Sequence, residues 1–392
     1  MLPLKGTTVV ALEQAVAAPF ATRQLADLGA RVIKIERPAT GDFAREYDRT
    51  VRGLSSHFVW LNRSKQSLTL DVKRTEGQEV LRRLLATSDV FIHNLAPGAV
   101  GRLGFDTASL RVAHPRLIIC QVTGYGTDGP YRDRKAYDLL VQSEAGVLSI
   151  TGTRDTPSKT GISVADIAAG MYAYSGILTA LLVRTTTGHG TALEVSLFDA
   201  LAEWMGFLLY YATYGGTEPP RAGASHAAIA PYGPYPAGDG KTVYLAIQNE
   251  REWARFCAAV LEAPELATDV RFATNTSRVS NRAELDAILA ERFNRSTSDT
   301  LIALLDGAGI ANARMNTVRE LAEHPQLVER GRWHAVGSPV GPIQALSPPV
   351  LMEGVDPVMN PVPTVGEHTD RILGEIGLDR DTIATWRRSG II

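Results

Sequence analysis

Short apolar runs rich in β-branched residues alternate with helical patterns through the first 125 residues of the chain. The runs read TTVVALE from Thr7, RVIKIE from Arg31, DVFIHN from Asp89 and RLIICQVTG from Arg116. Helical patterns such as APFATRQLADLG and GQEVLRRLLATS lie between them. Strands that alternate with helices of this length form βαβ units, which place the strands side by side in a parallel sheet. The sequence therefore predicts a Rossmann-like α/β domain.

The first turn of this pattern lacks the fingerprint of a dinucleotide site. It reads EQAVAAPF from Glu13 to Phe20 and contains no glycine, so it does not provide the close backbone approach that a pyrophosphate needs. Pro19 suits an early position of the following helix, and Gly29 suits the left-handed residue after the helix end. The prediction is a Rossmann-like architecture without its usual nucleotide signature.

The composition of the sequence changes after Trp204. A Pro- and Gly-rich stretch there leads to the strand pattern KTVYLAIQ and then to amphipathic helices. A chain of 392 residues also exceeds one ordinary core and suggests about two domains. We therefore expect a smaller α+β domain besides the larger one. The expected division is a large domain at 1–203, a linker at 204–225, a small domain at 226–325, a return linker over the surface at 326–365 and C-terminal helices at 366–392 that rejoin the large domain.

Composition bounds the partners and the compartment. The 40 basic and 42 acidic residues give a formal net charge of −2, so no global field attracts nucleic acid or an anionic membrane. Two cysteines, Cys120 and Cys257, are too few for a disulfide framework, and Cys120 lies in an apolar run typical of a buried thiol. The first residues lack the pattern of a signal peptide, and no histidine has a partner at zinc-ligand spacing. We expect a cytoplasmic protein with no metal, nucleic-acid or membrane partner.

Positive charge is concentrated locally. Residues 31–83 hold 12 of the 40 basic residues and seven acidic ones, which leaves about +5 in this window. Solvated loops and helix faces would explain such an excess. However, Arg37 and Lys73 come just after apolar strands, where open α/β sheets bind their ligands. The window is therefore a candidate site for a small polyphosphate.

Asp166 is the last charged residue before an uncharged run from Ile167 to Val183. We expect this run to form a buried helix that ends at TTTGHG, because its glycines and hydroxyl side chains do not suit a lone transmembrane span. Aspartate is a favoured N-cap, which would give Asp166 a structural role. Amide dipoles at a helix start would also stabilise the carboxylate anion as a nucleophile at neutral pH. Spacing alone leaves both roles open.

Four segments resemble one enzyme family. They read RQLADLGARVIKIERP, NRSKQSLTLDVKRTEGQEVLRRLLATSDVFIHNLAPGAVGRLGF, VTGYGTDGPY and SVADIAAGMYAYSGILTALLVRTTTGHG. They are similar to the class III CoA-transferases of the CaiB/BaiF type, among them formyl-CoA transferase and carnitine CoA-transferase. The similarity runs from residue 5 to about 205 and resumes at GEHTDRILGEIGL near the C-terminus.

The resemblance assigns roles to particular residues. Asp166 falls on the family's nucleophilic aspartate, and the backbone amides near Ala17 and Ala18 are possible oxyanion donors. Lys135 and Tyr137 border the pantetheine and thioester. The residues placed against coenzyme A are Arg37, Lys73, Asn94, Leu95, Ala96 and Arg102. Coenzyme A would enter as the substrate thioester with no tightly bound cofactor, and two ring-like chains would interlink as a homodimer.

The family chemistry implies a water-free site. A carboxylate that attacks an acyl-CoA forms a mixed anhydride and then an aspartyl-CoA thioester, and the anhydride must be protected from hydrolysis. Relatives close a run of glycines over the intermediate, whereas this chain reads APYGPYPAGDGKT at the equivalent segment. The apolar helix after Asp166 and the loop Gly124–Tyr131 are the candidates for shielding here.

Two other functions stay open. An α-methylacyl-CoA racemase needs a second acid–base group opposite the aspartate, but Tyr137 stands where the racemases have a histidine, and a phenol is a poor base at neutral pH. A non-catalytic acyl-CoA-binding protein is the other alternative. The small-domain sequence resembles relatives that use succinyl-CoA and dicarboxylates such as mesaconate, itaconate, citramalate or glutarate. Arg221 or His226 could supply a cation for the second carboxylate, although both also suit surface polar roles.

Overall fold

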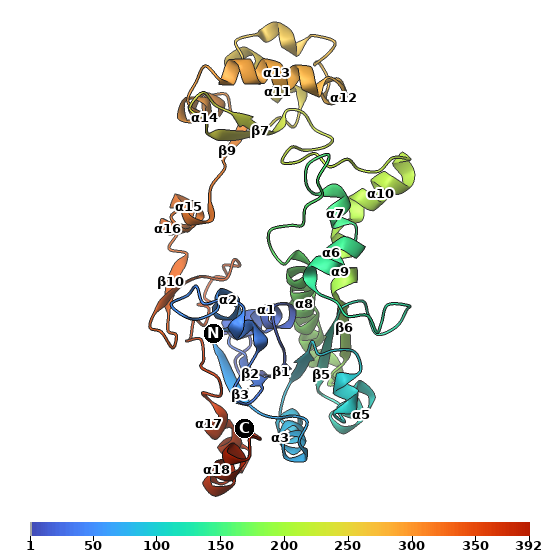
Figure 1. Cartoon of the computed structure of the whole chain (residues 1–392), viewed down its shortest axis with the longest axis vertical. Coiled ribbons are helices and arrows are strands. Elements are labelled where there is room, and N and C mark those ends of the chain that lie inside the picture. The colour runs from blue at the N-terminus through green and yellow to red at the C-terminus, as the bar shows by residue number, and fades with distance from the viewer. Residues whose placement is uncertain (1) are drawn as a thin grey trace. The chain divides into compact units, whose positions relative to one another are not determined.

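The computed structural model describes residues 2–392, which divide into two compact units (Figure 1). Unit 1 comprises the chain up to Ala145, Thr160–Gly206 and Leu327–Ile392. Unit 2 comprises Gly146–Lys159 and Phe207–Gln326. The units cut the chain differently from the expected domain ranges, because Gly146–Lys159 groups with the later part of the chain. Unit 1 holds the predicted nucleophile and all of the predicted coenzyme A ligands.

A six-stranded parallel sheet forms the centre of unit 1, in the order β3-β2-β1-β4-β5-β6. The strands are β1 (Thr8–Leu12), β2 (Arg31–Glu36), β3 (Lys65–Thr69), β4 (Val90–His93), β5 (Ile118–Thr123) and β6 (Ala192–Ser196). β1 lies between β2 and β4, with Val9 opposite both Val32 and Val90. The predicted parallel α/β architecture is confirmed, although β3 and β6 had no strand signal in the sequence analysis.

Helices cover both faces of this sheet. The helices α3 (Thr75–Ala86), α5 (Thr107–Ala113), α17 (Thr369–Glu375) and α18 (Arg380–Arg388) share one core cluster with Val10, Ile33 and Phe91 of the strands. Side chains of a strand alternate between the two faces. The opposite face is covered by α1 (Ala17–Asp27) and α8 (Val164–Thr187), which contact each other and the strands. Gly29 follows α1 with φ of +98°, as predicted.

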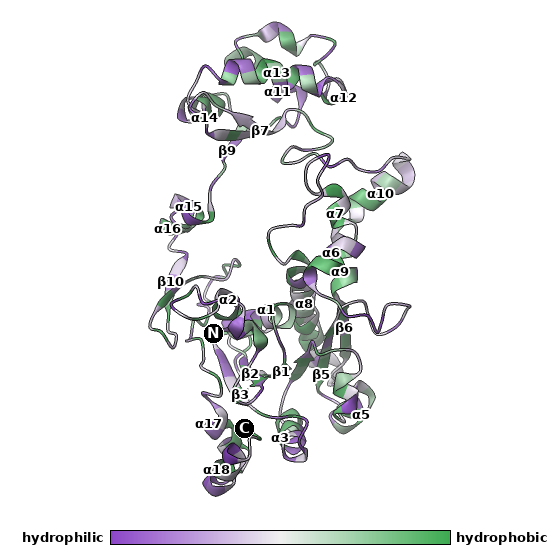
Figure 2. Cartoon of the chain, in the orientation of Figure 1, coloured by the Kyte–Doolittle hydropathy of each residue, from purple (hydrophilic) through white to green (hydrophobic). Residues whose placement is uncertain are grey.

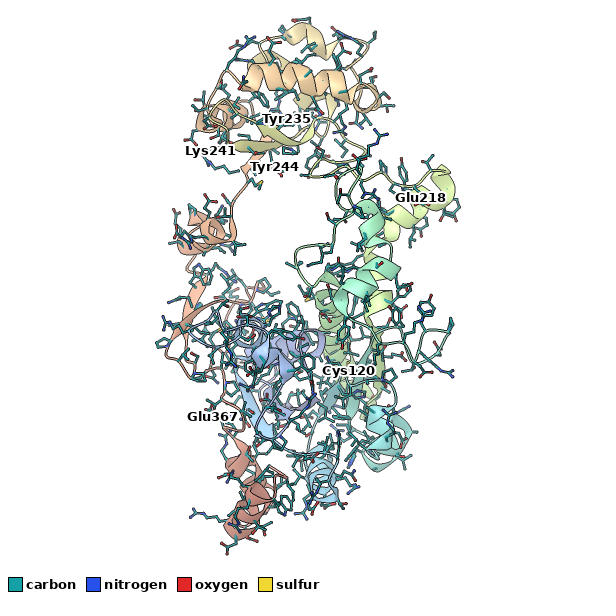
Figure 3. All side chains as sticks on the ribbon, viewed as in Figure 1. Cys120, Glu218, Tyr235, Lys241, Tyr244 and Glu367 are labelled. Carbon is teal, nitrogen blue, oxygen red and sulfur yellow. The ribbon has the colours of Figure 1, made fainter. Side chains whose placement is uncertain are left out.

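Shorter elements complete unit 1. They are η1 (Phe43–Glu46), α2 (Ser56–Asn62), α4 (Ala99–Arg102), α6 (Asp138–Glu144), α9 (Leu197–Trp204), β10 (Trp333–Val336) and β11 (Ile343–Leu346). Cys120 of β5 is a fully buried thiol, as predicted, and burial raises its pKa to about 12 (Figure 3).

Unit 2 contains an antiparallel three-stranded sheet in the order β7-β8-β9, and Val243 of β8 packs with Trp253 and Phe293 of the helices. The strands are β7 (Tyr232–Pro236), β8 (Thr242–Ala246) and β9 (Ala311–Arg314). The helices are α7 (Val147–Ile150), α11 (Glu250–Ala259), η2 (Pro264–Ala267), α12 (Asn275–Ser280), α13 (Arg282–Phe293), α14 (Ser298–Gly307) and α15 (Val318–Ala322). Two more helices, α10 (Gly206–Gly215) and α16 (Pro325–Val328), fall at the changes between the units.

The segment expected as a surface linker is instead packed against unit 1. β10 and β11 form an antiparallel hairpin, and Val336 and Val362 share a small core with Phe58 of α2. The backbone also bonds to unit 1, since the Arg63 guanidinium donates to the Leu346 carbonyl (3.1 Å) and the Ser64 hydroxyl donates to that of Val358 (3.1 Å). The proline-rich segment is therefore irregular in backbone but packed against the rest of unit 1.

The predicted helix after Asp166 is α8, and it ends at Gly188 with φ of +74°. Its buried residues are mostly small and lie on one face, namely Ala165, Ala168, Ala169, Gly170, Ala173, Ile177 and Ala180. Large apolar residues elsewhere along the helix are exposed, among them Met171, Tyr172, Leu182 and Val183. The prediction of a buried helix is thus right for one face and wrong for the rest. By length and composition α8 would suffice to cross a membrane, a test that soluble core helices also pass.

Candidate active site

The helix start that carries Asp166 is capped by another aspartate. α8 begins at Val164 after Ser163, whose side chain makes no capping bond, so Asp166 lies inside the first turn. Asp138 at the start of α6 accepts hydrogen bonds from the backbone N–H groups of Ala165 (2.8 Å) and Asp166 (3.4 Å). The predicted N-cap role of Asp166 is therefore wrong, and its carboxylate is left for another purpose.

The surroundings of Asp166 favour its neutral form. Burial, followed by the negative charge of Asp138, raises the pKa of Asp166 to about 7. The helix dipole, which the sequence predicts to stabilise the anion, is outweighed by burial and by the nearby carboxylate. A carboxylate with such a pKa is partly ionised at neutral pH and weakly solvated, which suits a nucleophile.

Tyr47 lies near this carboxylate, and Tyr137 lies near Tyr47. Tyr47 follows η1, and burial together with the charges of Asp42 and Asp166 and the phenol of Tyr137 raises its pKa to about 12. Tyr137 is the residue just before α6, and its side chain is 68% exposed. A close approach supports this arrangement, because a Cβ on Gly124 after β5 would lie 2.2 Å from the Cβ of Ala136. The exposed Lys135 belongs to the same segment, which the end of β5 holds in place.

The first turn of α1 lies beside the Asp166 face of α8. Gly170 is one helical turn after Asp166 and shares its face. A Cβ on Gly170 would lie 2.7 Å from the carbonyl oxygen of Ala17 and 3.0 Å from Phe20. No side chain caps α1, and Ala17 and Ala18 are almost fully buried. First-turn N–H groups have no partner within their own helix, so those of Ala17 and Ala18 can serve an anion here.

The predicted coenzyme A ligands Arg37 and Asn94 meet at the carboxyl edge of the sheet. The Arg37 guanidinium donates to the side-chain oxygen of Gln14 (3.2 Å). The Asn94 side chain accepts from the Gln14 backbone N–H (2.9 Å) and donates to its carbonyl (2.8 Å). Gln14 and Asn94 follow β1 and β4, the adjacent strands from which the strand order runs outward in opposite directions. Open α/β sheets bind ligands at this switch point.

The other predicted ligands follow the same strands but are not joined to this group. Lys73 is exposed in the turn between β3 and α3. After β4, Leu95 packs partly against the core, Ala96 is exposed, and the Arg102 guanidinium donates to the Pro97 carbonyl (3.3 Å). All of these residues follow the carboxyl ends of strands, which is the edge that also holds Arg37.

Most of the basic window is occupied by ion pairs. Of its 12 basic residues, nine form salt bridges, several of them buried. Within residues 2–392 the exceptions are Arg37, Arg52 and Lys73. The count of +5 therefore overstated the charge available to a ligand, although two of the three unpaired cations are the ones predicted to bind coenzyme A.

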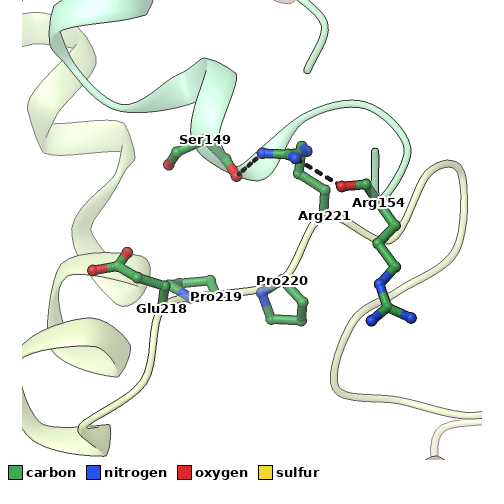
Figure 4. Close-up of a pocket in the computed structure, with 6 residues that line it drawn as sticks. All are labelled: Ser149, Arg154, Glu218, Pro219, Pro220 and Arg221. Atoms are coloured by element: carbon green, nitrogen blue, oxygen red, sulfur yellow. Dashed lines mark hydrogen bonds between the residues drawn. The ribbon is translucent and has the colours of Figure 1, made fainter. Parts of the chain in front are cut away.

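Arg221 and His226 lie in unit 2, where both have structural contacts. The Arg221 guanidinium donates to the carbonyls of Thr153 (2.9 Å), Ser149 (3.4 Å) and Arg154 (2.7 Å), beside a hollow of about 740 Å³ (Figure 4). It thus ties Gly146–Lys159 to the rest of the unit. His226 stacks on Tyr232 at 5.2 Å and its Nδ1 accepts from the Ala228 N–H. A role for His226 toward substrate stays a prediction. Among residues 2–392, no group of three His, Cys, Asp or Glu side chains could hold a metal ion.

An open parallel sheet with cations and amides at its switch point, and a half-buried carboxylate beside a helix start without a side-chain cap, are typical of doubly wound α/β enzymes that bind anionic ligands. The sequence model of CoA-transferase family III matches residues 4–369 of the chain. The chain therefore belongs to this family, as the resemblance predicted.

Known CoA-transferases and a solved structure of this family are similar to the chain over nearly its whole length. A succinyl-CoA:glutarate CoA-transferase of Mus musculus is 33% identical over 397 residues, covering 100% of this chain and 91% of its own length. A succinate–glutarate CoA-transferase of Agrobacterium fabrum is 34% identical and covers 95% of this chain and 96% of itself. The crystal structure of a CAIB/BAIF family protein from Brucella suis superposes with a TM-score of 0.84 at 35% identity, covering 95% of this chain and 99% of that one.

Besides Gln14, three residues near the site had no role in the sequence analysis. Asp138 caps α8, Tyr47 lies near Asp166, and Asp42 bonds to the backbone before α1. Asp138 immediately follows Tyr137, which the resemblance had already singled out. Asp42 and Tyr47 fall in an irregular segment after β2, where no periodic pattern signals a contact.

Proposed function

We propose that this CoA-transferase moves coenzyme A from succinyl-CoA to a small dicarboxylate of the glutarate, itaconate, mesaconate or citramalate type. The relatives described above are named for the glutarate reaction, and one from Chloroflexus aurantiacus is named for transfer from succinyl-CoA to D-citramalate. The observation that carries the proposal is the half-buried Asp166, with its raised pKa, beside the uncapped start of α1.

In the first half of the proposed reaction, an ionised Asp166 oxygen attacks the succinyl-CoA carbonyl and expels the thiolate, which leaves a mixed anhydride. The thiolate then attacks the aspartyl carbonyl, so succinate departs and an aspartyl-CoA thioester remains. The acceptor carboxylate attacks this thioester, and the released thiolate takes the acceptor acyl group from the second anhydride. Asp166 returns as a carboxylate. Each step exchanges one acyl bond for another, so no ATP is needed.

Local groups have distinct tasks in this scheme. The N–H groups of Ala17 and Ala18 would stabilise the oxyanion at each addition, which is where preorganised donors contribute most. Arg37, held by Gln14 beside Asn94, and the exposed Lys73 and Arg102 would bind the phosphates of coenzyme A. Lys135, Tyr137 and Tyr47 would border the thioester. Desolvation of Asp166 protects the anhydride from water.

Tyr47 is not a suitable base for the racemase alternative. A racemase requires a group near Asp166 that exchanges an α-proton at neutral pH. The neighbouring phenol of Tyr47 has its pKa raised to about 12, further from neutrality than an ordinary tyrosine. Membership of a CoA-transferase family also argues against a non-catalytic binding protein.

We also propose the interlinked homodimer and the cytoplasmic location that the sequence indicated. α10 has no buried residue, and Phe207, Tyr210 and Tyr214 on it are 70%, 69% and 81% exposed. Figure 2 shows hydrophobic residues along α10, and Met171 and Leu182 of α8 are exposed as well. Helices that are apolar on all sides are normally covered. A second copy of the chain would cover them.

A screen of acceptor acids tests the substrate class. The enzyme is incubated with succinyl-CoA, formyl-CoA or acetyl-CoA as donor and with each of a set of C5 dicarboxylates, oxalate and monocarboxylates as acceptor. New acyl-CoA species are identified by mass spectrometry, with Asp166→Asn as the inactive control. We expect new thioesters with at least one C5 dicarboxylate. Transfer only from formyl-CoA or acetyl-CoA, or only to oxalate or monocarboxylates, would show that the substrate proposal is wrong.

A further inference from the structure

Four fully buried ionisable side chains surround the backbone that leads into α1. Lys34 lies 2.8 Å from Asp42 and 3.4 Å from Glu13, and Lys65 lies 2.7 Å from the same Glu13 oxygen. All four side chains are 0% exposed in these pairs. Burying charges is costly even when they are paired, and apolar replacements are often at least as stable. Stability alone is therefore a weak reason for this cluster.

The cluster is bonded to the turn before the oxyanion donors. Asp42 accepts from the backbone N–H of Ala15 (3.2 Å), and Lys65 donates to the Pro19 carbonyl (3.0 Å). These two contacts bracket Ala17 and Ala18. Ala15 itself has φ of +61°, a left-handed conformation that is strained for alanine and persists only when its surroundings hold it.

Asp42 also bonds to the segment that carries Tyr47. The same Asp42 oxygen that accepts from Ala15 accepts from the backbone N–H of Ala44 (2.9 Å), which caps η1. Tyr47 follows η1 directly and lies near Asp166. One carboxylate oxygen thus connects the turn into α1 with the segment that carries Tyr47, while the second oxygen is fixed by Lys34.

We infer that Asp42 is a positioning residue for acyl transfer, which fixes the Ala15 turn, and with it the Ala17 and Ala18 amides, against the Asp166 carboxylate. The inference rests on the proposed nucleophilic role of Asp166. Asp42 is only 1% exposed, so it would touch neither coenzyme A nor the reacting acyl group. Its loss would therefore slow formation of the acyl-enzyme and leave binding of coenzyme A nearly unchanged.

Two double variants separate the effect of losing the Asp42 hydrogen-bond acceptor from the effect of losing its buried charge. Removing Asp42 alone would leave the buried Lys34 cation with only the longer contact to Glu13 (3.4 Å), so both variants carry Lys34→Met. Asp42→Asn/Lys34→Met keeps an oxygen that can accept from Ala15 and Ala44, whereas Asp42→Ala/Lys34→Met does not. Asp27→Asn is the matched control, because Asp27 is equally buried but pairs with Arg63 at the far end of α1.

The first assay measures, in a single turnover, the rate at which succinyl-CoA converts Asp166 into an activated acyl form that hydroxylamine traps. The second measures the Kd of coenzyme A. The alanine variant should be slower than the asparagine variant by about tenfold to a hundredfold, somewhat less than the usual effect of removing an oxyanion donor. Their Kd values should agree within about threefold. Asp27→Asn should lower the melting temperature and leave the trapping rate unchanged.

Equal trapping rates in the two double variants, or a loss of coenzyme A affinity as large as the loss of rate, would overturn the inference. Failure of the proposed function is recognised separately, because wild-type enzyme would then turn over without a label on Asp166. In that event the turnover numbers of the two variants decide the role of Asp42, and equal values would again refute it.

Discussion

Replacing Asp166 with asparagine should make the protein more stable at alkaline pH while it abolishes turnover. The cap of α8 is supplied by Asp138, so the substitution removes no capping bond. It removes instead a carboxylate whose pKa is raised from 3.8 to about 7 by burial and by Asp138. An amide of the same shape has no charge to desolvate and cannot form an anhydride.

The sign of the pH dependence follows from this pKa. Because the folded-state pKa lies above the unfolded value, the protonated carboxyl favours folding fully below pH 3.8, and this contribution is lost as pH rises through 7. A pKa raised from 3.8 to about 7 corresponds to about 4 kcal/mol, because a tenfold change in an equilibrium constant is about 1.36 kcal/mol. Partial solvent exposure of Asp166 screens this, so we expect the advantage of the asparagine variant to grow by about 1–2 kcal/mol between pH 5 and pH 8.

Scanning fluorimetry across this pH range provides the measurement, with the difference in Tm between the two proteins as the readout. A change of about 1–2 kcal/mol corresponds to a few degrees for a chain of this size. Asp199→Asn on α9 controls for the loss of any carboxylate from unit 1. A difference in Tm that does not vary with pH, or an asparagine variant that is less stable at pH 8, would refute the account of the Asp166 environment.

The remaining predictions concern coenzyme A, packing and assembly. Arg37→Ala and Lys73→Ala should each weaken coenzyme A binding by about 1–3 kcal/mol and raise KM, since charge-assisted contacts to phosphate are lost; Arg52→Ala, the third unpaired cation of the window, should not. Gly170→Ala should lower both Tm and kcat, at a cost of about 1–3 kcal/mol from overpacking against Ala17, whereas Gly176→Ala on the same helix meets only Leu193 at 3.6 Å and should be tolerated. Light scattering should give twice the chain mass of 42.3 kDa at micromolar concentration, and an active monomer would rule out the proposed dimer.

Strands with apolar β-branched runs were predictable, and strands without them were not. β1, β2, β4 and β5 all gave clear runs in the sequence. β3 reads KQSLT and has polar residues where an apolar run would signal a strand. Its Lys65 is buried in an ion pair with Glu13. β6 reads ALEVS and is an edge strand with its first residue exposed. Polar residues at buried positions hide a strand from pattern reading.

The site was predictable only where the resemblance or a strand end marked it. Asp166 followed from its isolated position and its match to the family, and Arg37 followed from the end of β2. The cap of α8 could not be predicted, because Asp138 lies 28 residues before Asp166 in the sequence and reaches α8 only in the folded chain. Charge counting failed for the same reason, since the partners of Lys34 and Lys65 lie on other elements.

The most direct test of the central claim is to identify the carboxylate that succinyl-CoA activates. Wild-type enzyme is incubated with succinyl-CoA, quenched with hydroxylamine, digested and mapped by mass spectrometry, with Asp166→Asn treated in parallel. The account predicts an aspartyl hydroxamate at Asp166, no label in the variant, and loss of nearly all turnover in the folded variant. A label on Asp138 or Glu144, with Asp166→Asn still active, would contradict it.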